Sequence, residues 1–446
     1  MIRALIFDFN GVLADDDPIH MQALREVARE EGLTFTDEEY LDKYLPLNDW
    51  DCFKTLYATH SAPLAPAKLD ELIRRKSIYY FRAIAGKPVM FGAAAAAVQA
   101  AANRCRLAIA SGAKMDEIRH ILEQALVDSK PVVAICKKQK DNGVWGGNLL
   151  GVAKSAKDGI KDVGTIAQYR HLTELGYPAN GRAHRLADRL LFRYLSRDPD
   201  PTLMFEHGKT VKTTPQSEEW VRDTMREAAT AALAEAGHGD DPRIRGSAHK
   251  IATGVSSFLR SSLSENPLCR SGSSLILNPA ANPPTWYTLA LIAALPEIRR
   301  ERGGFTERLG QYLSQPASRR TYTIAVGRKK LKPTHILLGD PTGVDARGHV
   351  KDIPLTLCFI ELMARIGAVG QCLGAQRALH RLYADCDNKG VWRPKSLASA
   401  PKAANPVTVH YWPLQPDTKT VDGRLTDVTF RLALIAVLMG RPIEYL

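Results

Sequence analysis

The start of the chain holds the feature that most limits how it can fold. A mostly apolar strand over residues 1–8 ends at Asp8, and Asn10 and Gly11 follow at once. Because side chains alternate along a strand, Asp8 and Asn10 are expected to share a face. Gly11 is expected to leave the strand through a backbone conformation that other residues rarely adopt. Open α/β sheets place ligands at the carboxyl ends of their strands, so this stretch predicts a site at Asp8.

A second strand is expected about a hundred residues later, over 106–112, where an apolar run ends in Ser-Gly. The residues between the two strands have helical periodicity over 15–85 and an alanine-rich helical stretch over 93–103. Another helix is expected at 114–124. Strand, helices, strand and helix in this order predict the beginning of a doubly wound α/β domain.

Three segments together resemble a known superfamily. Asp8-Phe-Asn-Gly-Val-Leu13, the inserted helices and Ala108-Ile-Ala-Ser-Gly112 are similar to the haloacid dehalogenase (HAD) superfamily. The closest likeness is to its phosphatase and phosphoglucomutase-like branch with a helical cap. The resemblance implies a partial HAD-like domain over residues 1–124, with the cap at about 15–85.

The resemblance also implies roles for individual residues. Asp8 would be the nucleophile that attacks phosphorus, and Asn10 stands at the position of the general acid/base. Ser111, Gly112 and Lys114 are the candidates for binding the phosphoryl group, at the start of a helix. Mg²⁺ is the implied cofactor, with Asp8 and Asn10 as its ligands.

Two departures from the family pattern are visible. Asn10 cannot transfer a proton, a task typically worth ~10²–10⁴-fold in rate. After Gln124 there is no apolar strand followed by an acidic pair, and no later lysine in the expected setting. The resemblance therefore covers a cap and half of a catalytic sheet.

Charge divides the chain into two parts. Residues 1–124 hold 15 Lys and Arg against 18 Asp and Glu, a net charge of −3. The remainder holds 45 against 30, a net charge of +15. Such asymmetry suggests two functional units, and the basic one would attract anions. A phosphorylated or diphosphate small molecule is the expected partner. Nucleic acid is not expected, because aromatic residues do not interleave with the basic cluster near residue 330.

Location and redox state also follow from composition. No apolar run is long enough for a membrane span, and no signal peptide precedes the first strand. The seven cysteines form no CxxC pair. We therefore expect a cytoplasmic protein with reduced thiols.

Residues 125–446 are expected to form an all-α array. Two phrases in it, Gln139-Lys-Asp-Asn-Gly-Val-Trp145 and Asp385-Cys-Asp-Asn-Lys-Gly-Val-Trp392, share a Gly-x-Trp ending. They resemble the repeat motif of the α/α-toroids of terpene cyclases and protein prenyltransferases. The alternative is that they are tryptophan-anchored turns in a helical array. Asp198-Pro-Asp-Pro-Thr202 is the phrase nearest to a cyclase acid motif, although two prolines around aspartates usually form a loop or cap the next helix.

The order of the parts resembles that of bacterial drimane-type sesquiterpene synthases, which implies a prenyl diphosphate substrate. The first hypothesis is therefore an enzyme, a Mg²⁺-dependent phosphate-ester or diphosphate hydrolase of HAD type fused to a toroid. The alternative is a degenerate HAD remnant whose basic helical domain acts as a binding or scaffold protein.

Overall fold

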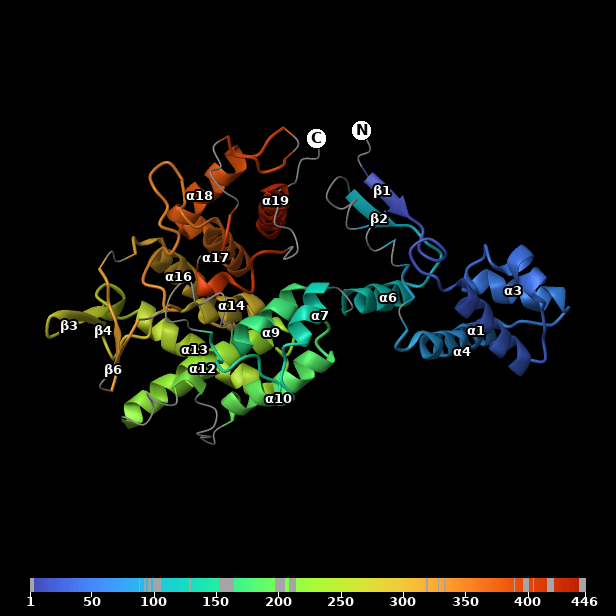
Figure 1. Cartoon of the computed structure of the whole chain (residues 1–446), viewed down its shortest axis with the longest axis horizontal. Helices are drawn as coiled ribbons and strands as arrows, with labels where there is room; N and C mark the ends of the chain where they lie inside the picture. The colour runs from blue at the N-terminus through green and yellow to red at the C-terminus, as the bar shows by residue number, and fades with distance from the viewer. Residues whose placement is uncertain are drawn as a thin grey trace. The chain divides into compact units, whose positions relative to one another are not determined.

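The protein forms two compact units, Met1–Ser129 and Lys130–Leu446. They are described separately here from a computed structural model (Figure 1). The structure describes residues 4–87, 89–91, 94, 98, 106–127, 130–151, 164–196, 205–207, 214–317, 320–327, 329–332, 334–388, 390–395, 401–403, 405–414 and 421–440.

The N-terminal unit contains two strands separated by helices. Its elements in chain order are β1 (Ala4–Phe7), α1 (Asp17–Glu30), α2 (Asp37–Glu39), the π-helix η1 (Tyr40–Tyr44), α3 (Asp49–Thr59), α4 (Pro66–Ile84), β2 (Arg106–Ile109) and α6 (Met115–Val127).

Strands β1 and β2 pair in parallel, with Phe7 opposite Ile109. Both strands therefore end at the same edge, as in a doubly wound sheet. Gly11 has a φ of +69°, and a Cβ atom there would lie 2.7 Å from a carboxylate oxygen of Asp17. The predicted glycine turn is thus confirmed, and Phe9 inside it is fully buried.

The inserted helices have their own apolar core. Helix α1 packs on α4, and α4 also packs on α3 (Figure 1). The buried face of α4 carries residues at helical spacing, which is the pattern that drives an amphipathic helix onto its neighbours. These residues are Leu69, Leu72, Ile73, Lys76, Tyr80 and Ile84.

The second unit is predominantly helical. Its elements are α7 (Lys130–Cys136), α9 (Thr165–Glu174), α10 (Arg182–Leu195), α12 (Pro215–Glu235), α13 (Pro242–Leu259), η3 (Ser262–Ser264), β3 (Leu268–Ser271), β4 (Ser274–Leu277), α14 (Trp286–Ala294), α15 (Pro296–Arg300), α16 (Phe305–Ser314), β5 (Ile324–Val326), β6 (Lys329–Leu331), α17 (Ile353–Ile366), η4 (Val369–Gln371), α18 (Leu373–Ala384), η5 (Pro406–Thr408) and α19 (Val421–Leu438).

Helices α12, α14 and α17 form the centre of this unit. Helix α12 packs on α9, α10, α13 and α14, and α17 packs on α14, α18 and α19. Residues 286–292 of α14 are all buried, as expected of a helix that is apolar on every side. The prediction of an all-α unit is wrong in one respect. Strand β3 pairs with β4, and β5 pairs with β6, in two antiparallel hairpins.

The two Gly-x-Trp phrases form similar turns. Gln139 bridges to Trp145, and Cys386 bridges to Trp392. Both tryptophans are buried, and each donates its backbone N–H to a threonine hydroxyl on a later helix, Thr165 and Thr429 respectively. Both phrases are therefore turns anchored by a buried tryptophan, which is compatible with the toroid and with its alternative. The toroid remains a prediction.

Some expectations fall outside the described residues. Most of the alanine-rich stretch 93–103 and all of Asp198-Pro-Asp-Pro-Thr202 lie there. None of the helices in the described ranges is both long and apolar enough to cross a membrane. The six cysteines whose placement is described are free thiols.

Candidate functional site

The carboxyl ends of β1 and β2 open into a cleft of about 460 Å³. The fold brings together the five candidate site residues, which all line this cleft. They are Asp8, Asn10, Ser111, Gly112 and Lys114. Their convergence follows from the parallel pairing of the two strands, because Asp8 follows β1 and Ser111 follows β2. Asp8 is exposed in the cleft, and one of its oxygens accepts a hydrogen bond from the backbone of Phe9.

Asn10 is held by a carboxylate behind the cleft. Its Nδ2 atom donates to both oxygens of Asp16, at 2.9 and 2.8 Å. Asp16 is fully buried and also accepts from the Tyr80 hydroxyl at 2.6 Å. Burial alone would raise the pKa of Asp16, but hydrogen bonds from His20, Tyr80 and Asn10 hold it below its ordinary value. Asn10 therefore serves as a neutral partner of an ionised Asp16.

A lysine from the inserted helices reaches the same cleft. Lys76 of α4 forms an ion pair with Asp49 at the start of α3, and its Nζ lies 2.9 Å from Nδ1 of His20. His20 stacks on Tyr80 and lies 3.4 Å from Asp16. Burial would raise the pKa of Asp49, but the charges of Lys76 and Lys114 lower it.

The predicted phosphate-binding residues lie at the start of α6. The hydroxyl of Ser111 accepts from the Ala113 backbone at 3.2 Å and donates to Asn10 at 3.4 Å. Lys114 forms an ion pair with Asp49 at 3.0 Å and donates to Ser77 at 2.6 Å. Its side chain is 34% exposed and lines the cleft.

Glu117 is the carboxyl of the cleft that lacks a full set of partners. It is 2% exposed, and its Oε1 has no hydrogen-bond partner among the described residues. Its Oε2 accepts only a long hydrogen bond, 3.4 Å, from the Lys114 backbone. Burial raises the pKa of Glu117, and the charges of His20 and Lys76 offset this only in part. A carboxyl of this kind can carry a proton closer to neutral pH than an ordinary glutamate.

The cleft holds oxygen atoms that could bind a metal ion. Asp8 and the Asn10 carbonyl are oxygen donors of the kind that Mg²⁺ prefers. Across the described ranges, however, no group of three or more His, Cys, Asp or Glu side chains is arranged to hold a metal. The side chain of Asn10 is already bonded to Asp16. The described side chains therefore form no closed cage for a metal, and Mg²⁺ as the cofactor stays a prediction, since Mg²⁺ is usually held by one or two carboxylates together with substrate phosphate and water.

Two groups of residues were not predicted from the sequence: His20, Asp49 and Lys76, which line the cleft, and Asp16 and Tyr80, which lie behind it. One signal could have found Lys76, because this charged residue lies on the apolar stripe of α4 between Ile73 and Tyr80. A lysine is almost never fully buried unless it is paired. Asp49 carries no comparable signal, since an acidic residue in the first turn of a helix is ordinary.

Comparison with known proteins identifies the first part of the chain. The sequence model of the haloacid dehalogenase-like hydrolases matches residues 2–161. The N-terminal part is therefore a HAD-like hydrolase domain, and residues 162–446 lie outside the match. The match runs past the N-terminal unit, whose last residue is Ser129. No solved protein structure matches the chain.

Proposed function

We propose that the N-terminal cleft hydrolyses a phosphate ester, with Asp8 as the nucleophile. The observation that carries the proposal is the convergence of an exposed carboxylate, the Ser111 hydroxyl and the start of α6 at one sheet edge. Hydroxyls and the N–H groups at a helix N-terminus suit a phosphoryl group. An Asp8 oxygen would bond to phosphorus as the ester oxygen leaves, and water would then release inorganic phosphate from Asp8.

The leaving oxygen needs a proton that Asn10 cannot give. Glu117 lines the same cleft with an unpartnered oxygen, and we assign it this donor role. Glu117 is left deprotonated by this transfer. In the second step the attacking water gives a proton to Glu117, which restores its starting state. The reaction then consumes one water and yields the alcohol and phosphate. Asp49 keeps Lys76 in place, and Lys114 is the cation that can turn to the phosphate.

The substrate's alcohol part is expected to be apolar. One wall of the cleft carries apolar and aromatic side chains: Leu24, Tyr40, Leu45, Pro46, Leu47 and Trp50. This wall supports a prenyl-type phosphate more than a sugar phosphate, because burying apolar surface is worth about 25 cal/mol per Å². Farnesyl phosphate, with an apolar alcohol part, and glycerol phosphate, with a polar one, are suitable probes of this preference.

The test is phosphate release from 4-nitrophenyl phosphate and from these two probes, with added Mg²⁺ and with EDTA. Asp8→Asn is expected to abolish release, and Asp15→Asn is the matched control, since Asp15 is exposed and does not line the cleft.

Glu117→Gln is expected to lower the rate ~10²–10⁴-fold, and its exposed neighbour Asp116 provides the control Asp116→Asn. Release that survives Asp8→Asn contradicts the proposal.

The alternative is a binding protein built on a HAD-like remnant. The incomplete metal-ligand set among the described residues favours it. It predicts that the wild-type protein binds a phosphate ester, more weakly at high salt, and releases no phosphate under any of these conditions.

A further inference from the structure

A separate pocket lies wholly within the second unit. It has a volume of about 470 Å³ and lies between α12, α13 and the segments that flank β4 and β5. This is within the range of small-molecule sites, ~300–1,000 Å³. Its apolar wall is made by Ile251, Val255, Leu277, Ile324 and Ile336.

One side of the pocket carries a row of acids. Glu219, Asp223 and Glu227 are spaced by four residues along α12, so they lie on one face of the helix. Asp223 is neutralised by Arg226 at 3.2 Å and by Lys250 at 3.8 Å. This acidic face is notable because residues 125–446 carry a net charge of +15.

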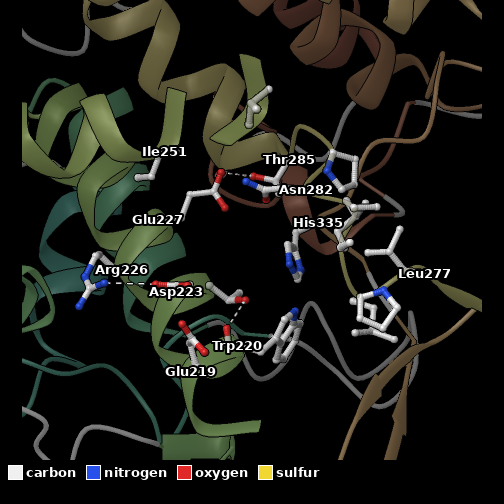
Figure 2. Close-up of a pocket in the computed structure, with 18 of the residues that line it drawn as sticks. Glu219, Trp220, Asp223, Arg226, Glu227, Ile251, Leu277, Asn282, Thr285 and His335 are labelled. Atoms are coloured by element: carbon white, nitrogen blue, oxygen red, sulfur yellow. Dashed lines mark hydrogen bonds and ion pairs between the residues drawn. The ribbon is translucent and has the colours of Figure 1, made fainter. Parts of the chain in front are cut away.

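Glu227 is the deepest acid of the row, and no basic residue is paired with it in the described part of the chain. One of its oxygens, Oε1, accepts hydrogen bonds from the hydroxyls of Thr285, at 2.8 Å, and Thr288. These two threonines cap α14, so the carboxyl is fixed at a helix N-terminus. No described residue bonds to the second oxygen. Figure 2 shows Glu227 reaching from α12 toward Thr285 and Asn282.

A second polar side chain faces the pocket without a partner. His335 is 7% exposed, and neither of its ring nitrogens has a hydrogen-bond partner among the residues described. Figure 2 places its ring between Trp220 and the Thr285–Asn282 group. Burial lowers the pKa of His335 to about 4, so the ring is neutral near pH 7 and does not repel a cation. The ring nitrogens have no protein partner among the described residues, so a ligand atom in the pocket could bond to them.

We propose that this pocket binds a small molecule that carries a protonated amine on an apolar body. The ammonium group bonds to the free oxygen of Glu227 and supplies the positive charge that this carboxyl lacks. The face of Trp220 offers a further attraction for a cation. The ring of His335 provides a hydrogen-bonding position, and the apolar wall receives the rest of the ligand.

The probes are 2-phenylethylamine, its neutral analogue 2-phenylethanol and the anion 3-phenylpropionate, measured by titration calorimetry with the full-length protein near pH 7. The amine is expected to bind most tightly. Glu227→Gln is expected to weaken amine binding roughly 10- to 100-fold, because a hydrogen bond to a charged group is lost. Binding of the alcohol is expected to stay unchanged in this variant.

The matched control is Glu218→Gln. Glu218 lies on the same helix, pairs with Arg222 and does not line the pocket. Circular dichroism checks that both variants fold. The proposal is overturned if the amine does not bind, if it binds no better than the alcohol, or if the two variants bind it equally. Asp8→Asn is expected to bind the amine normally, which separates this result from the hydrolase proposal.

Discussion

Asp16 in the N-terminal unit is fully buried and Glu227 in the second unit is partly buried, and the two carboxyls differ in how many of their oxygens are bonded. Both oxygens of Asp16 accept hydrogen bonds, from Asn10 and Tyr80. Only one oxygen of Glu227 does so, from two threonines. Hydrogen bonds keep the pKa of Asp16 below its ordinary value, whereas burial raises the pKa of Glu227 despite its threonine partners.

The number of bonded oxygens distinguishes a carboxylate that holds the structure together from one that can still bind a ligand. A buried ion with all its partners holds its neighbours in place, and removing it leaves donors unsatisfied. A carboxyl with one oxygen that no protein group bonds can accept a hydrogen bond from a ligand. By the same reasoning, Glu117 belongs with Glu227 rather than with Asp16, since its Oε1 is unpartnered.

The largest effect is expected from Asp16→Ala. The substitution leaves buried donors from Asn10 and Tyr80 without an acceptor, so we expect a loss of about 3–5 kcal/mol in the free energy of unfolding. Urea unfolding at neutral pH measures it. Asp15→Ala, at the exposed neighbouring position, is expected to change stability by no more than about 0.5 kcal/mol. Equal effects of the two changes would mean that Asp16 is not the centre of the network.

A smaller effect is expected from Tyr80→Phe. Only the hydroxyl that donates to Asp16 is lost, so the expected cost is about 1.5–3 kcal/mol, as for a hydrogen bond to a charged group. Tyr79→Phe is the control, because the Tyr79 hydroxyl donates to Glu30 at an exposed site. If the two variants unfold at the same urea concentration, the buried Tyr80–Asp16 hydrogen bond does not stabilise the protein more than the exposed Tyr79–Glu30 hydrogen bond.

The smallest effect concerns the pH dependence of stability. Asp16 has a lowered native pKa, so its stabilising contribution is present above its unfolded value of 3.8 and is lost as pH falls through the native pKa. Glu227 has a raised native pKa, so its contribution is present below 4.5 and is lost as pH rises through the native pKa. Relative to the wild type, Asp16→Asn should therefore recover at low pH and Glu227→Gln should gain stability as pH rises. If the stabilities of the two variants relative to the wild type changed with pH in the same direction, the contrast between Asp16 and Glu227 would be contradicted.

The sequence predicted which residues would meet at the N-terminal cleft, whereas it gave no sign of the pocket at Glu227. Asp8, Asn10 and Ser111 could be placed together because parallel strands end at one edge, and the glycine turn at Gly11 followed from the same pattern. Lys76 and Asp49 were missed because their pairing depends on how α3 and α4 pack, which periodicity does not give. Glu227 looks like an ordinary acid on the surface of a helix in the sequence, because its partners Thr285 and Thr288 come about sixty residues later.

The central claim is that Asp8 receives a phosphoryl group. The direct measurement is to mix the protein with 4-nitrophenyl phosphate, stop the reaction with acid within one turnover and map the phosphate by mass spectrometry. We expect a phosphorylated, hydroxylamine-sensitive Asp8 in the wild type and in Asp15→Asn, and none in Asp8→Asn. Phosphate release by the wild type without any label on Asp8, or a label of equal size in Asp8→Asn, would contradict the claim.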